Sequence, residues 1–163
     1  KRYGICEVIL VYSSIRDLAT GKQDAMLQIL IVEDNPVSAQ LLAYFLRDQG
    51  NCEIVATADE AVELVGFCLE EGTPFHLICM DLNIPGDGWE AIRRLRELEA
   101  ENEVSAENRA RILLTTVADS DELESHADLK ELYDGYLKKP YVREDLLARL
   151  EQLDIHPAQA AGD

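Results

Sequence analysis

Acidic side chains end two apolar, strand-like segments of this chain. The segment 29–32 is followed by Glu33 and Asp34, and the segment 77–80 is followed by Asp81. If both segments are strands of one parallel sheet, their carboxyl ends meet at the same edge and bring the three carboxylates together. Because like charges held close together repel, such a cluster requires a cation or another use for its charge.

Two further segments end in groups that can act on an anion. The apolar run 112–114 ends in Thr115, and the run 135–138 leads into Lys139. A carboxylate nucleophile, an acid pair that can hold a divalent cation, a hydroxyl and an ammonium group are the parts needed to place a phosphoryl group on an aspartate. The pattern therefore indicates phosphoryl transfer to Asp81.

Strand-like and helix-like segments alternate from Met26 onwards, and this order predicts the elements that position the site. Unbroken apolar strands separated by helices are typical of a parallel sheet that is covered on both faces. We therefore expect an α/β fold with a doubly wound, five-stranded parallel sheet. Ligands bind at the carboxyl ends of the strands in such sheets, which is where the polar residues above fall.

Capping residues and apolar spacing predict where the first helix lies. Asn35 is a suitable N-cap, Gly50 falls just past the end, and Val37, Leu41 and Phe45 recur on one helical face. The remaining predictions are a short strand at 54–56, a helix whose start at Thr57 and Glu60 resembles a capping box, a helix with Ile92, Leu95 and Leu98, a long surface loop at 99–109, a helix at about 120–132, and a last helix with Leu146, Leu150 and Leu153.

Length and composition exclude several classes of protein. With 163 residues, 47% of them hydrophobic, the chain is expected to form a globular domain. Its net charge of −17 argues against direct binding of DNA or RNA and favours cationic partners, including metal ions. No apolar stretch approaches the ~18 residues that span a bilayer, so no membrane segment is expected.

The cysteines are expected to be free thiols. Cys6, Cys52, Cys68 and Cys79 form no CxxC pair, so we predict neither a metal site nor a disulfide framework for them. Cys68 and Cys79 lie in apolar patterns and are expected in the core. Free thiols suit a reducing compartment, which favours the cytoplasm.

Composition divides the chain into three parts. Residues 1–25 carry four basic and three acidic residues, and we expect an N-terminal extension of unknown role with a strand at 5–12 and a short helix. Residues 26–156 contain every residue singled out above and form the predicted domain. Residues 157–163 are a small, polar tail.

Four short motifs lie at the ends of the predicted strands: 29–35, 80–88, 114–116 and 136–140. Their order and approximate spacing resemble those of the receiver domain of bacterial response regulators, the phosphoacceptor module of two-component signalling. The resemblance covers about residues 26–153, and it implies a flavodoxin-like (βα)5 fold similar to that of a chemotaxis regulator.

The resemblance also implies roles for the acidic residues. Asp81 is the implied phosphoacceptor, which takes a phosphoryl group from the phosphohistidine of a sensor histidine kinase or a histidine phosphotransfer protein. Glu33, Asp34 and Asp81, with the backbone carbonyl of Asn83, are implied to hold the Mg²⁺ on which this reaction depends.

Three other residues are implied to recognise or report the phosphoryl group. Lys139 pairs with the carboxylate and later with the phosphoryl oxygens, and Thr115 forms a hydrogen bond to the phosphoryl group. Tyr136 is implied to follow Thr115 inward and to switch a protein-interaction face for an unknown downstream protein, unless it is only a half-buried edge aromatic. The resemblance also implies a cis peptide bond before Pro140, whereas Lys138 fits a solvated surface lysine.

The chain departs from the family pattern at three places. The loop 85–88 is one residue shorter than usual, Thr116 replaces the commoner alanine, and 120–134 is more acidic than usual. These departures concern the switching face more than the chemistry.

Other functions fit the residues less well. A phosphatase of haloacid-dehalogenase type also forms an aspartyl phosphate, but it needs a second acid two residues after the nucleophile, where Asn83 stands. A receiver-like module that only binds proteins has no need of the intact acids, hydroxyl and lysine. In a flavodoxin-like cofactor binder, the acids at 33–36 would repel the phosphate. We therefore predict a signalling receiver that catalyses only its own phosphorylation and dephosphorylation, and not an enzyme.

Overall fold

The computed structural model describes residues 26–117 and 129–156. Within these residues the order of elements is β1 (Leu27–Val32), α2 (Pro36–Leu46), β2 (Gly50–Val55), α3 (Ala58–Glu70), β3 (Leu77–Met80), α4 (Gly88–Glu101), β4 (Arg111–Thr116), β5 (Gly135–Lys138) and α6 (Arg143–Gln152). The strands form one parallel sheet in the order β2-β1-β3-β4-β5. This is the doubly wound α/β fold that the sequence predicts.

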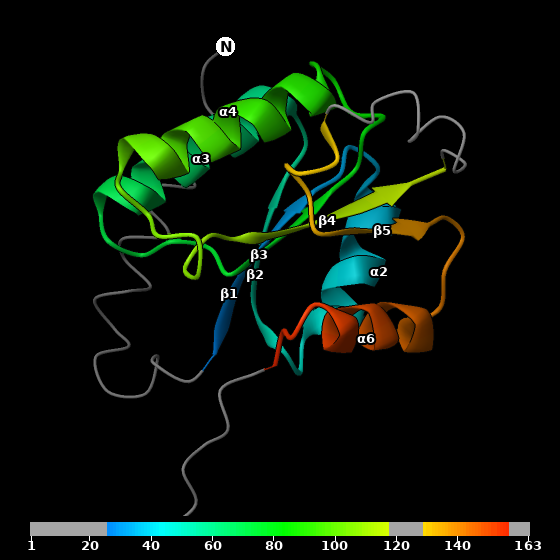
Figure 1. The fold of residues 1–163 in the computed structure, drawn as a ribbon. Coiled ribbons are helices and arrows are strands. Elements are labelled where there is room, and N and C mark those ends of the chain that lie inside the picture. Colours follow the sequence, from blue (N-terminus) through cyan, green and yellow to red (C-terminus); the bar gives the residue numbers. More distant parts are fainter. Residues whose placement is uncertain (1–25, 118–128, 157–163) are drawn as a thin grey trace, which may run out of the picture.

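Helices cover both faces of the sheet. α3 and α4 lie side by side on one face, and α2 and α6 lie on the other (Figure 1). Alternate residues of each strand point to opposite faces, so the unbroken apolar strands fill two cores at once. The core under α3 and α4 contains Leu30, Val32, Ile78, Met80 and Leu114, and the core under α2 and α6 contains Ile29, Ile31, Leu77, Cys79 and Leu113.

The order of the sheet places a topological switch point between β1 and β3. The chain leaves β1 towards α2 on one face and leaves β3 towards α4 on the other face. Loops that diverge in this way open a crevice at the carboxyl ends of the two strands. Val32 pairs with Met80 in this part of the sheet, so the residues after each strand are neighbours.

Capping at the predicted residues is confirmed for two helices. Asn35 Oδ1 accepts hydrogen bonds from Val37 N and Ser38 N at 3.0 and 3.1 Å. Thr57 Oγ1 accepts one from Glu60 N at 3.2 Å, which starts α3. These bonds satisfy amide groups that would otherwise lack partners at the helix ends.

The apolar face of α2 differs from the prediction. Val37 and Leu41 are 75% and 47% exposed, and only Phe45 of the predicted face packs against the core. α2 buries instead a different face, formed by Ala39, Leu42 and Leu46. Because this helix is apolar on more than one side, spacing alone did not identify the buried face.

Two element boundaries also differ from the prediction. Gly50 begins β2, which is longer than the strand predicted at 54–56. A Cβ atom at Gly50 would lie 2.2 Å from the carbonyl oxygen of Leu27 on β1, so this close strand pairing requires glycine. α4 continues to Glu101, so the polar surface loop begins at Asn102 instead of residue 99.

Several predictions fall partly or wholly outside the described residues. The helix predicted at about 120–132 is described only from residue 129, where Leu132 N bonds Leu129 O in a turn. The strand at 5–12, the short helix after it and the tail at 157–163 are not described. Among the helices of residues 26–117 and 129–156, none has the length and apolar character needed to cross a membrane.

Candidate functional site

Three carboxylates meet where β1 and β3 end. Glu33, Asp34 and Asp81 each offer an oxygen, and these oxygens lie within 4.8 Å of one another. Glu33 and Asp81 are each only 4% exposed, whereas Asp34 lies at the surface. The structure thus brings together the acids that the sequence singles out.

Backbone amide groups orient the two buried carboxylates. Asp81 Oδ1 accepts a hydrogen bond from Asn83 N at 2.9 Å, and Glu33 Oε1 accepts one from Asn35 N at 3.2 Å. Each bond closes a short turn in which a side chain contacts the backbone two residues later. The second oxygen of each carboxylate then faces the cation described next.

Lys139 joins the two buried carboxylates. Its Nζ atom lies 2.5 Å from Glu33 Oε2 and 2.7 Å from Asp81 Oδ2. Burial acts to lower the pKa of Lys139, but the hydrogen bonds and charges of Asp81 and Glu33 outweigh it and raise the pKa. Lys139 is therefore a charged ammonium group in this pocket, while Lys138 is exposed, as the strand alternation predicts. The peptide bond between Lys139 and the next residue is cis.

Thr115 brings an unsatisfied hydroxyl group to the same edge. Met80 pairs with Leu114, so Thr115 lies beside Asp81 in the sheet. Its side chain is 1% exposed, and Oγ1 has no hydrogen-bond partner among the described residues. Such a buried hydroxyl costs about 1–3 kcal/mol of stability, so it is a candidate for contact with a bound ligand.

Tyr136 lies apart from this pocket. It is 37% exposed on β5, and the guanidinium carbon of Arg149 lies 5.8 Å from the centre of its ring. Tyr141, which no sequence motif marks, is half-buried near the acids. Burial, followed by the proximity of Cys79, Glu33 and Asp81, raises the pKa of Tyr141 well above its usual range.

The charges of the pocket fit a divalent cation. Three carboxylates gather here, and the Lys139 ammonium group, which contacts Glu33 and Asp81, is the one cation that the described residues place against them. Hard carboxylate oxygens at a site with one exposed member, Asp34, suit Mg²⁺, which takes few protein ligands and keeps several waters. Glu33, Asp34 and Asp81 are the residues that could hold it.

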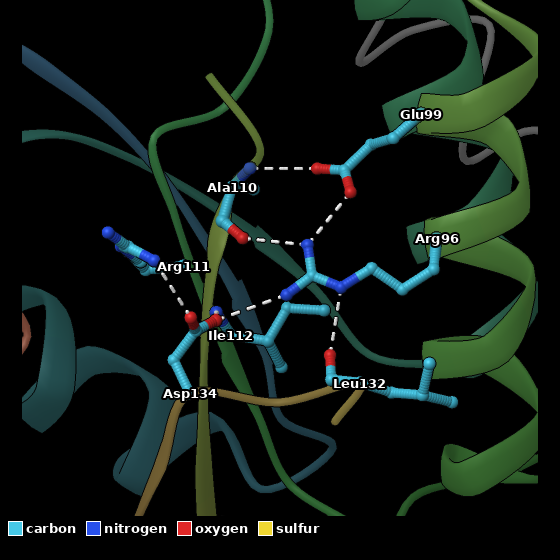
Figure 2. Close-up of polar contacts among 7 residues, drawn as sticks. All are labelled: Arg96, Glu99, Ala110, Arg111, Ile112, Leu132 and Asp134. Atoms are coloured by element: carbon cyan, nitrogen blue, oxygen red, sulfur yellow. Dashed lines mark hydrogen bonds and ion pairs between the residues drawn. The ribbon is translucent and has the colours of Figure 1, made fainter. Parts of the chain in front are cut away.

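A second polar cluster, which no sequence motif indicates, lies at the opposite edge of the sheet. Arg96, Glu99 and Asp134 meet there beside the first residues of β4 (Figure 2). Glu99 lies within the stretch predicted to be a surface loop, yet it is 4% exposed. No local pattern marks this cluster, because Arg96 and Asp134 lie 38 residues apart.

We call Glu33, Asp34, Asp81, Thr115 and Lys139 the acid pocket. The fold and the acid pocket define a phosphoacceptor domain of the signalling type. The family described as the response regulator receiver domain matches residues 29–151. The chain belongs to this family, and the resemblance stated from its motifs is confirmed.

Two relatives show the settings in which similar receivers occur. The transcriptional regulatory protein AruR of Pseudomonas aeruginosa is 29% identical over 137 residues, which cover 82% of this chain and 52% of AruR. Probable histidine kinase 6 of Oryza sativa is 30% identical over 167 residues, covering 91% of this chain and 16% of the kinase. The chain therefore spans about half of the first relative and a small part of the second.

A solved structure with the same fold contains the expected metal. The receiver domain of the sensor histidine kinase PA1611 from Pseudomonas aeruginosa has magnesium coordinated in its active-site cleft. It is 28% identical, with a TM-score of 0.62, and the match covers 78% of this chain and 97% of that one. This likeness and the acid cluster of this chain agree on Mg²⁺ as the cofactor.

Proposed function

We propose that Asp81 accepts a phosphoryl group from a phosphohistidine in a reaction that requires Mg²⁺. The observation that carries this proposal is the position of the Asp81 carboxylate. It is buried, lies 2.7 Å from Lys139 Nζ and is within 4.8 Å of the oxygens of Glu33 and Asp34. The unpartnered hydroxyl of Thr115 lies beside it.

The chain supplies most of the groups that this transfer needs. An oxygen of Asp81 forms a bond to phosphorus while the bond from phosphorus to the imidazole nitrogen breaks, and the imidazole keeps the electron pair. Lys139 pairs with the phosphoryl oxygens, and Thr115 donates a hydrogen bond to one of them. Later attack by water on phosphorus releases phosphate and restores the carboxylate, so the chain also catalyses its own dephosphorylation.

The same acids would hold the metal. We assign Glu33, Asp34 and Asp81 to Mg²⁺, together with the backbone carbonyl of Asn83. Bound Mg²⁺ neutralises charge on the phosphoryl oxygens as the two anions approach.

An exposed apolar stripe on α2 supports a protein as the donor. Val37, Leu41 and Tyr44 are 75%, 47% and 55% exposed and recur along one side of this helix. Contiguous exposed apolar residues are typical of protein-binding surfaces. α2 begins two residues after Asp34, so a protein that brings a phosphohistidine to Asp81 can cover the stripe. A sensor histidine kinase or a histidine phosphotransfer protein fits this requirement.

Phosphorylation then changes a surface that a downstream protein reads. We propose that Thr115 turns towards the phosphoryl group and that Tyr136, exposed on the neighbouring strand, moves inward after it. In this proposal residues 26–156 are the functional unit, 1–25 and 157–163 flank it, and the protein works in the cytoplasm as a signalling domain without an external substrate.

Mass spectrometry after incubation with acetyl phosphate and Mg²⁺ tests the assignment. The parent protein should gain the mass of one phosphoryl group, and Asp81→Asn should gain none. Asp87→Asn is a matched control, because Asp87 is an exposed N-cap of α4 in the same loop and asparagine caps equally well. Equal modification of Asp81→Asn and the parent would show that another residue is the acceptor.

A further inference from the structure

Arg96 uses all three nitrogens of its guanidinium group inside the fold. Its side chain is 10% exposed in the middle of α4. Nη1 donates to Glu99 Oε2 and to the carbonyl of Ala110, both at 2.8 Å. Nε donates to the carbonyl of Leu132 at 2.8 Å, and Nη2 donates to Asp134 Oδ2 at 3.1 Å (Figure 2).

The two carboxylates of this cluster also hold the backbone. Glu99 Oε1 accepts a hydrogen bond from Ala110 N at 2.8 Å. Asp134 Oδ2 accepts one from Ile112 N at 2.8 Å, and its Oδ1 accepts one from Arg111 at 3.0 Å. We call Arg96, Glu99, Asp134 and their backbone partners the Arg96 cluster.

The Arg96 cluster anchors the amino ends of two strands to α4. Ala110 directly precedes β4, and Asp134 directly precedes β5. The opposite ends of the same strands carry the phosphoryl-binding candidates: Thr115 belongs to β4, and Lys139 follows β5. Both strands are short, with six and four residues, so little chain separates each anchor from its functional group.

We propose, as an extension of the function proposed above, that Arg96 is a positioning residue for phosphoryl transfer. By tying β4 and β5 to α4, Arg96 sets how far each strand extends towards the carboxyl edge. It thereby sets where the Thr115 hydroxyl and the Lys139 ammonium group stand relative to Asp81. Small errors in such positions are costly, because a misplacement of about 1 Å can slow a reaction by about 100-fold.

The affinity for Mg²⁺ distinguishes a positioning role of Arg96 from a general loss of structure at the site. Glu33, Asp34 and Asp81 follow β1 and β3, whereas the Arg96 cluster joins α4, β4 and the segment before β5. A loosened cluster should therefore displace Thr115 and Lys139 more than the metal ligands. Phosphorylation should slow while the affinity for Mg²⁺ stays the same.

Arg96→Lys is the main test variant. Lysine keeps the positive charge but presents a point donor, so it cannot reach the four acceptors that the planar guanidinium spans. Asp134→Asn, which keeps the shape of the side chain and weakens the cluster from the strand side, is the second test variant. Arg94→Lys is the matched control, because Arg94 lies on the same helix and bonds only the exposed Glu97 and Glu101 within the part of the chain that the structure describes.

Two quantities are measured for each full-length protein, well below its melting temperature. One is the dissociation constant of Mg²⁺ alone, by calorimetry, and the other is the rate constant of phosphorylation by acetyl phosphate at saturating Mg²⁺. We expect Arg96→Lys to lower the rate constant about tenfold and Asp134→Asn to lower it about threefold, as misplacement of reacting groups predicts. Arg94→Lys should match the parent, and every Mg²⁺ dissociation constant should stay within about twofold of the parent value.

Each other outcome has a definite meaning. If Arg96→Lys reacts as fast as the parent, or if its Mg²⁺ affinity falls together with its rate, the positioning role is wrong. If Arg96→Lys does not fold, the phosphorylation rate constant and the Mg²⁺ dissociation constant of Asp134→Asn decide in the same way. If the parent binds Mg²⁺ but is not phosphorylated, the proposed function fails and the positioning role fails with it.

Discussion

The acid pocket at the carboxyl edge of the sheet and the Arg96 cluster at its amino edge contain the same kinds of side chain. In the Arg96 cluster, two carboxylates face the guanidinium groups of Arg96 and Arg111. In the acid pocket, three carboxylates gather within the described residues, and one ammonium group, that of Lys139, contacts two of them. The first set of charges is balanced by the protein itself, and the second is not.

The two clusters also differ in how completely their polar groups are hydrogen-bonded. Both oxygens of Glu99 and both oxygens of Asp134 accept hydrogen bonds. In the acid pocket, Thr115 Oγ1 has no partner within the described residues. A buried polar group therefore does not by itself mark a binding site, whereas a buried group left without its partner is a sign that a ligand completes the site.

Removal of the cation from the balanced cluster should have the largest effect on stability. Arg96→Met leaves the buried Glu99 without its guanidinium partner and Asp134 with Arg111 alone. Breaking a buried ion pair costs about 3–5 kcal/mol. We expect the urea midpoint to fall accordingly, and by the same amount with and without Mg²⁺. A loss of stability that Mg²⁺ repairs would contradict the separation of the two clusters.

Removal of the cation from the acid pocket should have a smaller effect that metal reverses. Lys139→Met leaves Glu33 and Asp81 without their ammonium partner, and we expect a loss of about 2 kcal/mol without metal. Mg²⁺ at about 100 times its dissociation constant should return about 2.7 kcal/mol. Urea unfolding of Lys138→Met, which changes the exposed neighbour, provides the control and should match the parent.

Removal of the unpartnered hydroxyl should have the smallest effect, and one of opposite sign. Thr115→Val keeps the shape of the side chain and removes a buried hydroxyl that has no hydrogen-bond partner among the described residues, so stability should rise by up to about 1 kcal/mol. Thr57→Val should instead lower stability, because the Thr57 hydroxyl caps α3. Thermal melts of both variants test whether the Thr115 hydroxyl lacks a partner. A Thr115→Val protein that melts below the parent would mean that this hydroxyl has a hydrogen-bond partner in solution.

The acid pocket was predictable from the sequence because each of its residues ends a strand. Strand ends are visible in a single sequence, and a parallel sheet brings them to one edge whatever the strand order. The positions of Glu33, Asp81, Thr115 and Lys139 therefore followed from four local patterns.

The Arg96 cluster and the buried face of α2 could not be found in the same way. Arg96 contacts Leu132 and Asp134, which lie 36 and 38 residues further along the chain, and no periodicity in the sequence indicates such a contact. For a polar residue in the middle of a helix, such as Arg96, sequence patterns say little about which residues it contacts.

In α2, apolar residues lie on both the core side and the solvent side, so only tertiary packing shows that Leu42 is buried and Val37 is not.

The exposed stripe on α2 has a consequence for how copies of this protein meet one another. Exposed apolar side chains such as Val37, Leu41 and Tyr44 would promote self-association in a neutral protein. This chain carries a net charge of −17, so two copies repel as they approach. That repulsion acts over about 8 Å at physiological ionic strength, beyond the range of apolar contact. The charge thus opposes self-association through the stripe and favours its contact with surfaces that are neutral or basic.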